Sequence, residues 1–476
     1  VPYATSLSWD LTNAAFGGTS ADGTETVTME WQDGAGNWSG PTSHDIVLDR
    51  IPPAGSVSIN GGAATVHSAI VTLALTATDA GSGVSSASIA NDPGMTSPIS
   101  VPCPSGSCST PYTLPAGNGP KTVYATFADK LGNTSAPTAA SIALTIPIRL
   151  DDATYPDLAG FANDRYGTAA ALAEQAFPGG ASTVYVASGA NFPDALGAGA
   201  AAGKALGPVL LVSPTAIPPA IAQELTALRP STIYVVGGPA SVSDAVKTAL
   251  KAFAGTVTRL DTAHFPDLSG YPNDRYGTAA AVAEQAFPTG AATVYVASGA
   301  NFPDALGAGA AAIKGHGPVL LVGPTAIPPA IAHELTALRP STIYVVGGPA
   351  SVSDAVKTAL RAFAGTVTRL DTAHFPDLAG YPNDRYGTAA AVTEQAFGGT
   401  ASTVYVASGA NFPDALGAGA AAGSAGGPVL LVTPTTTPAA IAHELSVLKP
   451  TTIYIVGGTA SVSDAVMAAV AAYMGP

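Results

Sequence analysis

The chain has 476 residues, with 18 Lys and Arg against 32 Asp and Glu and a formal net charge of −14. This acidity argues against a protein that grips nucleic acid through its phosphates. Hydrophobic residues make up 47% of the chain, which excludes overall disorder and supplies cores for about three or more domains. No stretch reaches the ~18 uninterrupted apolar residues of a membrane helix. The composition therefore predicts an acidic, soluble, multidomain protein without a membrane span.

The first residues, Val1 to Tyr3, show no charged segment followed by an apolar one, so we expect a processed or truncated start rather than an export leader. Cys103 and Cys108 flank four residues in a stretch rich in Ser, Thr, Gly and Pro. This spacing suits a local disulfide and an oxidising compartment, hence a secreted surface protein, while two free thiols in a cytosolic loop remain the alternative. Zinc would need about four ligands, and no second cysteine pair exists.

Residues 1–147 have an all-β pattern. DGAGNWSGP from Asp33 is similar to DKLGNTSAP from Asp129, a separation of 129 − 33 = 96 residues, which is the size of an immunoglobulin-like sandwich. One complete sandwich is predicted at 51–147, and the end of a preceding one at 1–50. DAGSG at Asp79 and DKLGN at Asp129 are predicted as turns. A calcium loop, which needs five or more oxygen ligands, is the weaker alternative, so no metal site is predicted.

Internal repeats dominate the rest of the chain. NDRYGTAAA recurs with a period of 273 − 163 = 110 residues, beginning at Asn163, Asn273 and Asn383. VYVASGANFPDALGAGAAA recurs unchanged with the same period. Three domains of one type are therefore predicted, at 148–258, 259–368 and 369–476.

Helix and strand patterns alternate within each copy. In the first copy, a helix is expected over 164–177, a strand over 183–187 and a second helix from Pro193. The run at 208–212 lacks polar alternation, as a strand buried on both faces does, and further strand and helix patterns follow to residue 253. The alternation predicts a parallel α/β domain. The small side chains of ALGAGAAA allow the second helix to lie close to a neighbour.

The boundaries of the copies suggest how they assemble. Copies one and two each end in TVTRL, from Thr256 and Thr366, whereas copy three runs to Tyr473 without this segment. An equivalent, IPIRL, lies before copy one at Ile146. We therefore predict an intramolecular trimer of repeats, a closed ring in which the segment at Ile146 supplies the strand that copy three lacks.

The three copies resemble the cell wall binding repeat 2 family of Gram-positive surface-layer proteins and autolysins. The resemblance covers about two thirds of the chain and rests on DRYGTA, ASGANFPDAL, PVLLV and VVGGPASVSD, which begin in the first copy at Asp164, Ala187, Pro208 and Val235. It implies Rossmann-like or toprim-like modules, three of which pack around a pseudo-threefold axis and bind an anionic secondary wall polymer. The chain departs from the family's Ile-Leu-Leu motif by Val209, Val319 and Val429. The upstream region resembles bacterial immunoglobulin-like repeats.

The implied partner is an anionic wall polymer or peptidoglycan, but the repeats themselves carry 15 basic and 22 acidic residues. Attraction between the repeats and the polymer must therefore be local. The candidate ligand-binding residues recur in each copy: Arg165, Arg275, Arg385, Ser188, Ser298, Ser408, Asn191, Asn301, Asn411, Asp194, Asp304 and Asp414. An Arg165–Asp194 ion pair within one copy, and capping by Ser188 and Asn191, remain alternatives. Core or module-interface positions are predicted at Leu210, Leu211, Leu320, Leu321, Leu430 and Leu431.

Catalysis and cofactors are not predicted. No His recurs in all three copies, Ser188 lacks the GxSxG spacing, and GGPASV lacks the dinucleotide-binding spacing. The leading prediction is a non-catalytic anchor that holds a secreted protein on the cell wall, with the immunoglobulin-like part as a spacer. The alternatives are the targeting half of a wall hydrolase or adhesin, and a small-molecule binding protein that uses the strand ends of each copy.

Overall fold

The computed structural model describes residues 5–151, 153–191, 193–301, 303–411 and 413–475. Val1 to Tyr3, on which the expectation about an export leader rests, lie outside the described residues. The chain forms two units, Val1–Ile146 and Pro147–Pro476, each with a hydrophobic core of its own. Among the helices of the described ranges, none has the length and apolar character needed to cross a membrane.

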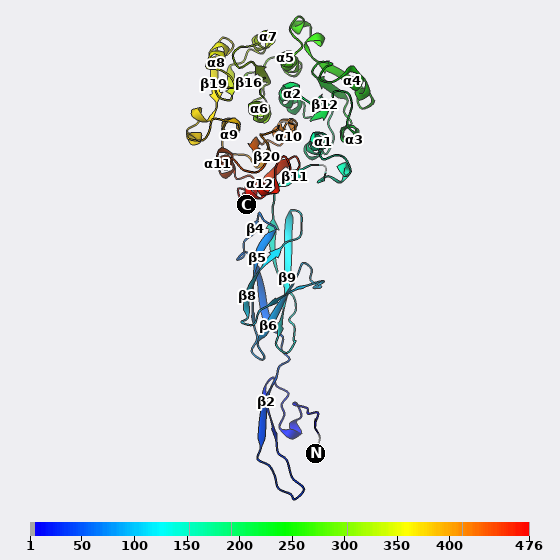
Figure 1. Cartoon of the computed structure of the whole chain (residues 1–476), viewed down its shortest axis with the longest axis vertical. Helices are drawn as coiled ribbons and strands as arrows, with labels where there is room; N and C mark the ends of the chain where they lie inside the picture. The colour runs from blue at the N-terminus through cyan, green and yellow to red at the C-terminus, as the bar shows by residue number, and fades with distance from the viewer. Residues whose placement is uncertain (1–4, 152, 192, 302, 412, 476) are drawn as a thin grey trace. The chain divides into compact units, whose positions relative to one another are not determined.

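Among its described residues, the first unit has strands and one short helix, η1 (Ala14–Phe16). Its first hairpin pairs β1 (Gly23–Met29) with β2 (Thr42–Leu48) in antiparallel register. The hairpin of β9 (Gly119–Asp129) and β10 (Thr138–Leu144) begins 96 residues later on both strands, since 119 − 23 = 138 − 42 = 96. The repeat of DGAGN and DKLGN therefore corresponds to a repeated hairpin (Figure 1).

Strands β3 to β10 of this unit form two sheets around one core. The first contains β3 (Ala54–Ile59), β5 (Ile70–Thr78) and β8 (Ser107–Thr113). The second has the order β4-β10-β9-β6-β7, with β4 at Thr65–Val66, β6 at Val84–Ala90 and β7 at Ile99–Pro102. β5 alternates exposed and buried residues, as a strand with one face on a core does. A disulfide joins Cys103 and Cys108, the pair whose spacing suits one.

The second unit contains the three α/β copies. Copy one comprises η2 (Pro156–Leu158), α1 (Arg165–Ala176), β12 (Thr183–Ser188), α2 (Pro193–Lys204), β13 (Val209–Val212), α3 (Pro219–Leu228), β14 (Thr232–Val236), α4 (Asp244–Ala249), η3 (Leu250–Ala252) and β15 (Thr256–Leu260). Copy two comprises η4 (Thr262–His264), η5 (Pro266–Leu268), α5 (Arg275–Ala286), β16 (Thr293–Ser298), α6 (Pro303–Lys314), β17 (Val319–Val322), α7 (Pro329–Leu338), β18 (Thr342–Val346), α8 (Asp354–Leu360) and β19 (Thr366–Leu370). Copy three comprises η6 (Thr372–His374), η7 (Pro376–Leu378), α9 (Arg385–Phe397), β20 (Thr403–Ser408), α10 (Ala418–Ser424), β21 (Val429–Val432), α11 (Ala439–Leu448), β22 (Thr452–Val456) and α12 (Asp464–Ala471).

Each copy forms a four-stranded parallel sheet, as its alternating pattern predicts. In copy one the order is β13-β12-β14-β15. The leucines of the VLLV strands, predicted as core or module-interface positions, are fully buried: Leu210, Leu211, Leu320, Leu321, Leu430 and Leu431. Asp164 caps α1 by accepting hydrogen bonds from the N–H groups of Tyr166 and Gly167, because the first turn of a helix has unsatisfied donors.

The sheet of copy three takes its fourth strand from the segment before copy one. β11 (Ile148–Leu150) pairs in parallel with β22. The Arg149 guanidinium then donates to the carbonyl oxygens of Gly457 (2.8 Å) and Val462 (2.9 Å) and pairs with Asp464. Closure of the ring by this segment is therefore confirmed.

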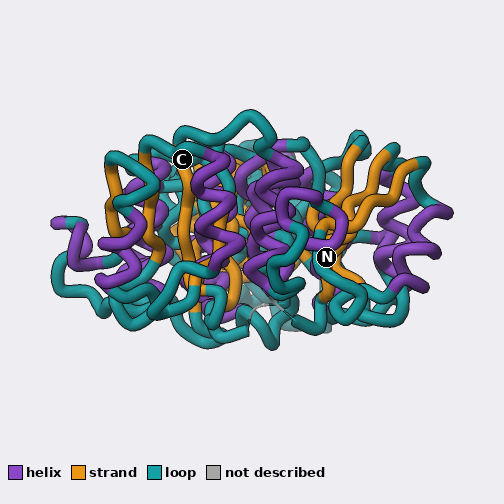
Figure 2. Tube along the Cα trace, turned by 90° about the horizontal axis from the view of Figure 1, so that it is seen from above, coloured by secondary structure: helices purple, strands orange, loops and turns teal. Residues whose placement is uncertain are grey.

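Three helices of small residues meet at the centre of this unit. α2, α6 and α10 pack on one another, with α1, α5 and α9 around them (Figure 1). Seen from above, a middle group of helices has strands on either side of it (Figure 2). A Cβ on Gly309 would lie 3.3 Å from the Cα of Gly419, so two of these helices approach almost backbone to backbone. The prediction that this helix can lie close to a neighbour is confirmed.

A candidate polymer-binding cleft between copies

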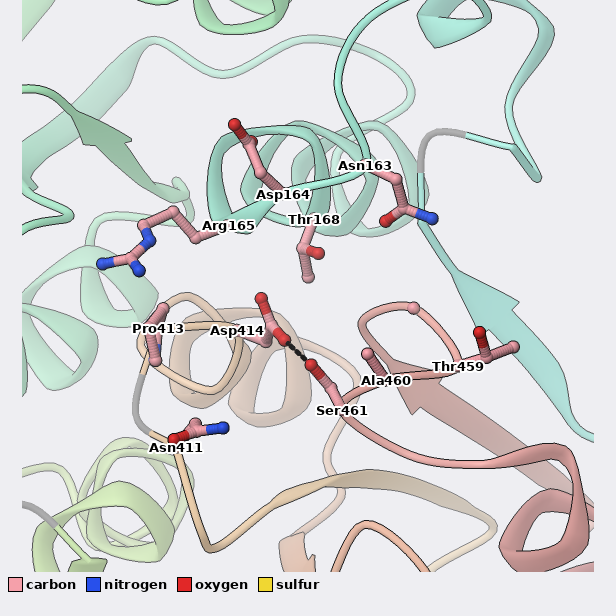
Figure 3. A pocket seen from close by; sticks show the side chains of 11 residues that line it. Asn163, Asp164, Arg165, Thr168, Asn411, Pro413, Asp414, Thr459, Ala460 and Ser461 are labelled. Carbon is pink, nitrogen blue, oxygen red and sulfur yellow. Dashed lines mark hydrogen bonds between the residues drawn. The ribbon is translucent and has the colours of Figure 1, made fainter.

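A cavity of about 510 Å³ lies where copy three meets copy one (Figure 3). Copy one contributes residues around the start of α1, and copy three contributes the turn that precedes α10 and the loop after β22. The lining residues are Asn163, Asp164, Arg165 and Thr168 from copy one, and Asn411, Pro413, Asp414, Gly458, Thr459, Ala460 and Ser461 from copy three. The cavity therefore requires two copies, which a single repeat cannot provide.

Asp414 lies at the centre of this cavity. Its carboxylate accepts a hydrogen bond from Ser461 of the same copy, and Thr168 of copy one points toward it across the cavity (Figure 3). Burial raises the pKa of Asp414, and the hydroxyl groups of Ser461 and Thr168 and the charge of Arg165 lower it in part. The carboxyl group thus holds its proton to a higher pH than an exposed aspartate does.

The same arrangement recurs at the two other junctions between copies, where copy one meets copy two and where copy two meets copy three. Asp194 accepts from Ser241 at 2.5 Å, and Asp304 accepts from Ser351 at 2.5 Å. Burial again raises the pKa of Asp194 and of Asp304, opposed by hydroxyl groups that include Thr278 and Thr388 of the following copy. The unit thus carries three junctions of one design.

A glycine after each central strand makes room for this aspartate. Gly237 has a φ of +93°, and a Cβ there would lie 2.4 Å from Oδ2 of Asp194. The equivalent Gly347 and Gly457 have the same clash with Asp304 and Asp414. Glycine is required on both counts, because other residues rarely adopt this backbone conformation and their Cβ would displace the carboxylate.

The arginine whose charge lowers the pKa of each aspartate belongs to the neighbouring copy. The charge of Arg275 in copy two lowers the pKa of Asp194 in copy one, and the charge of Arg165 lowers the pKa of Asp414 in copy three. The expected pairing of Arg165 with Asp194 inside one copy is therefore wrong, because ring closure places the start of α1 against copy three. Within its own copy, Arg165 donates to the carbonyl oxygen of Gly189, and its guanidinium points away from Asp414 in Figure 3.

The predicted serines do not reach the cavity. Ser188, Ser298 and Ser408 are fully buried, and the hydroxyl oxygen of Ser188 accepts a hydrogen bond from the N–H of Ala190. Direct contact of these serines with a polymer is therefore wrong, since the end of the buried strand encloses the side chain. Asn411 does line the cavity, and its equivalents Asn191 and Asn301 are likewise exposed.

Sequence reasoning missed several groups that meet at the junctions. Thr168 lies inside the DRYGTA motif, Ser461 inside SVSDAV and Asn163 directly before the first of these. Their recurrence was visible in the sequence. Nothing local, however, indicated that the two motifs come together from different copies.

The three junctions differ in detail. Thr459 replaces the proline found at Pro239 and Pro349 in the other copies. In copy three, the α-helix begins at Ala418, whereas α2 and α6 begin at the prolines equivalent to Pro413. The sequence from Pro413 to Ala422 is identical in all copies, so the surroundings, not the local sequence, change the start of the helix.

Comparisons with known proteins agree with this architecture. The profile of the family "Cell wall binding domain 2 (CWB2)" matches residues 159–247, 269–357 and 379–467, which together exceed half of the chain. N-acetylmuramoyl-L-alanine amidase LytC of Bacillus subtilis (strain 168) is 27% identical over 273 residues, covering 57% of this chain and 49% of that protein. The chain thus spans about half the length of this relative.

Two solved structures have a similar fold. Cwp6 from Clostridium difficile superposes with a TM-score of 0.60 at 18% identity, covering 89% of this chain and 68% of Cwp6. Cwp8 from Clostridium difficile gives a TM-score of 0.57 at 20% identity, covering 76% of this chain and 60% of Cwp8. At these identities the similarity concerns the fold alone.

Proposed function

Since the chain belongs to the cell wall binding domain 2 family and anchors to the cell wall, we propose that the three junctions between its copies are the sites that hold an anionic secondary wall polymer. The observation that carries this proposal is the cavity between copies three and one, which gathers amide, hydroxyl, carboxyl and guanidinium groups from two copies. The anchor acts by binding, without catalysis or a cofactor.

The chemistry of the cavity suits a polyhydroxylated anionic chain. Asn411 and Thr459 offer hydrogen-bonding groups at the cavity wall, and Arg165 supplies positive charge. Burial raises the pKa of Asp414, so this carboxyl keeps its proton to a higher pH than an exposed aspartate does, and a protonated carboxyl does not repel an anion. Local charge of this kind reconciles an acidic unit with an anionic ligand.

The other parts of the chain fit the same role. We assign the two-sheet body of the first unit to the immunoglobulin-like class, acting as a spacer, and each α/β copy to the Rossmann-like class. The disulfide of the first unit supports a protein that is secreted to the surface of a Gram-positive cell. Targeting of a wall hydrolase is the less favoured alternative, because the match to the amidase leaves half of that protein uncovered.

Co-sedimentation with purified cell walls tests the proposal. The full chain is expected to sediment with intact walls, to lose binding when the secondary polymer is chemically removed, and to bind less as salt rises. The triple variant Asn191→Ala, Asn301→Ala, Asn411→Ala is expected to weaken retention about tenfold or more, since each junction loses hydrogen bonds worth ~1 kcal/mol and the three junctions act together.

A matched control uses equivalent exposed hydroxyls on α3, α7 and α11. The triple variant Thr226→Ala, Thr336→Ala, Ser446→Ala lies on helices that do not line the cavity and should bind as the parent does. Binding that persists on stripped peptidoglycan would move the ligand from the polymer to glycan or peptide. Equal retention by both triple variants, with unchanged unfolding temperature, would place the site elsewhere.

A further inference from the structure

The three junctions between copies are nearly identical in the residues that form them. All but one of the residues that line the cavity between copies three and one have the same residue type at the equivalent positions of the other two junctions. The exception is Thr459, whose equivalents are Pro239 and Pro349. Within this lining, the three junctions therefore differ by one chemical change.

This exchange of threonine for proline leaves the contact between copies unchanged. A Cβ on Gly458, directly before Thr459, would lie 3.0 Å from the side chain of Asn163 in copy one. The equivalent distances at the other two junctions, measured from Gly238 and Gly348, are 2.9 and 3.0 Å. Thr459 thus changes the chemistry of the cavity wall without changing how closely this loop approaches the neighbouring copy.

Thr459 adds hydrogen-bonding groups that proline lacks. A threonine carries a backbone N–H and a hydroxyl, whereas proline has neither. Thr459 is exposed, and neither of these groups makes a hydrogen bond to another residue in the described part of the chain. In Figure 3 its hydroxyl oxygen points toward the side of the cavity on which Asn163 lies. Both groups are therefore available to a ligand.

The asparagine at the other two junctions is held by a buried aspartate of its own copy. Nδ2 of Asn273 donates to Asp261 (3.3 Å), and Nδ2 of Asn383 donates to Asp371 (3.2 Å). Both aspartates are 1% exposed, and each also contacts a histidine three residues further along the chain at 2.5 Å. The side-chain amide at these two junctions is thus already engaged.

The equivalent asparagine of copy one, Asn163, is not engaged in this way. Its neighbouring aspartate, Asp151, accepts hydrogen bonds from the N–H (3.1 Å) and the hydroxyl (2.8 Å) of Thr154, which replaces the histidine of the other copies. The Asn163 side chain lines the cavity and makes no hydrogen bond to another described residue. The junction between copies three and one therefore offers a ligand this amide as well as Thr459.

We propose that the junction between copies three and one binds the wall polymer most tightly of the three, and that Thr459 and Asn163 distinguish it. This inference rests on the proposed function, which assigns the polymer to all three junctions. Hydroxyl, N–H and amide groups bind the hydroxyl groups and anionic oxygens of such a polymer without first breaking a hydrogen bond inside the protein. At the other junctions, the polymer meets proline and an amide that is held by an aspartate. The ring thus has one strong site and two weaker ones.

Single substitutions at one equivalent position weigh the three junctions separately. Asn411 lies at the junction of copies three and one, and Asn191 and Asn301 lie at the other two. The full chain is titrated with short polymer fragments, released from purified walls by partial acid hydrolysis, in an isothermal calorimeter. Asn411→Ala is expected to weaken binding about fivefold or more, and Asn191→Ala and Asn301→Ala to cause smaller losses. Three equal losses would overturn this inference and leave the proposed function intact, whereas a parent chain without polymer binding would overturn both.

The natural exchange of threonine and proline tests Thr459 itself. Thr459→Pro gives this junction the lining of the other two, and proline suits the loop because the equivalent loops carry it. We expect about fivefold weaker binding from Thr459→Pro, about twofold stronger binding from Pro239→Thr, and parental binding from Thr226→Ala on α3. If Thr459→Pro lowers the unfolding temperature, Thr459→Val, which removes only the hydroxyl, should still weaken binding. Parental affinity in the stably folded Thr459 variant would overturn its role.

The asparagines provide a second matched pair. Asn163→Ala is expected to weaken binding about fivefold, because it removes an available amide from the strong site. Asn273→Ala is expected to have a smaller effect, because its amide already donates to Asp261. A loss in Asn273→Ala that equals or exceeds the loss in Asn163→Ala would contradict the assignment of the strong site.

Discussion

At the scale of single residues, the least expected feature is a buried glutamate in each α/β copy. Glu224, Glu334 and Glu444 are 2–3% exposed on α3, α7 and α11. Burial raises the pKa of each to about 8, and a second acid nearby, such as Glu284 beside Glu334, adds to the shift. In the folded ring these groups therefore hold a proton near neutral pH.

The raised pKa makes the stability of the ring depend on pH. The pKa of such a glutamate is 4.5 when unshifted and about 8 when folded, so the folded state binds more protons between these values. Its contribution is complete below about pH 4.5 and is lost as pH rises toward 8. We expect Glu334→Gln to raise the unfolding temperature at pH 8 by about 2 °C or more, since 1 kcal/mol corresponds to roughly 2–4 °C in a domain of this size class.

Calorimetry at two pH values checks this prediction, with pH 5 as the internal control. At pH 5, Glu334 is already protonated, so the glutamine variant should unfold within about 1 °C of the parent. A gain that is larger at pH 5 than at pH 8 would contradict the assignment of a neutral buried glutamate.

At the scale of elements, the central helices depend on glycine to different degrees. A Cβ on Gly309 would lie 3.3 Å from the Cα of Gly419, so backbone would have to move. A Cβ on Gly199 would have its nearest neighbour at 3.9 Å, which is an ordinary contact. The three helices are thus equivalent in sequence and unequal in packing.

This inequality predicts opposite effects of the same substitution. Alanine favours a helix over glycine by ~1 kcal/mol, so Gly199→Ala should be neutral or stabilising. Gly309→Ala should lower stability by about 1–3 kcal/mol, because overpacking a close helix contact outweighs the gain in propensity. Chemical denaturation of the two variants tests this order, and a more stable Gly309→Ala protein would refute it.

At the scale of the whole molecule, the ring depends on a three-residue strand. Besides its pairing with β22, β11 is held by the Arg149 side chain, which donates to two carbonyl oxygens and pairs with Asp464. The equivalent Arg259 and Arg369 in the other copies contact Gly237 and Gly347 in the same way and are 1% exposed. The arginine hydrogen bonds that hold the fourth strand in copies one and two therefore also hold β11, which comes from a distant part of the chain.

Arg149→Met is expected to loosen this closure. It keeps the apolar stem but removes charged hydrogen bonds worth about 1.5–3 kcal/mol. Hydrogen exchange should accelerate at the amide of Gly457, which donates to Leu150, and to a lesser extent in the equivalent strand ends of copies one and two. Arg361→Met at the end of α8 is the control. Unchanged exchange at Gly457 would show that backbone pairing alone closes the ring.

Local sequence patterns determined much of this architecture. The 110-residue period gave the three copies, and the apolar run VLLV gave the buried strand with Leu210 and Leu211. The missing TVTRL segment in copy three predicted the role of the segment at Ile146. These features could be predicted because hydrophobic periodicity is visible within a few neighbouring residues, and repetition is visible by comparing identical segments.

Only the tertiary structure decided which chemical groups meet. The charge of Arg165 lowers the pKa of Asp414 rather than that of Asp194, and Ser188 is enclosed at the end of its strand. Each of these outcomes depends on segments far apart in the chain being brought together by strand pairing or ring closure. A side chain's charge, burial and partners depend on such neighbours, and a local pattern of residues does not contain them.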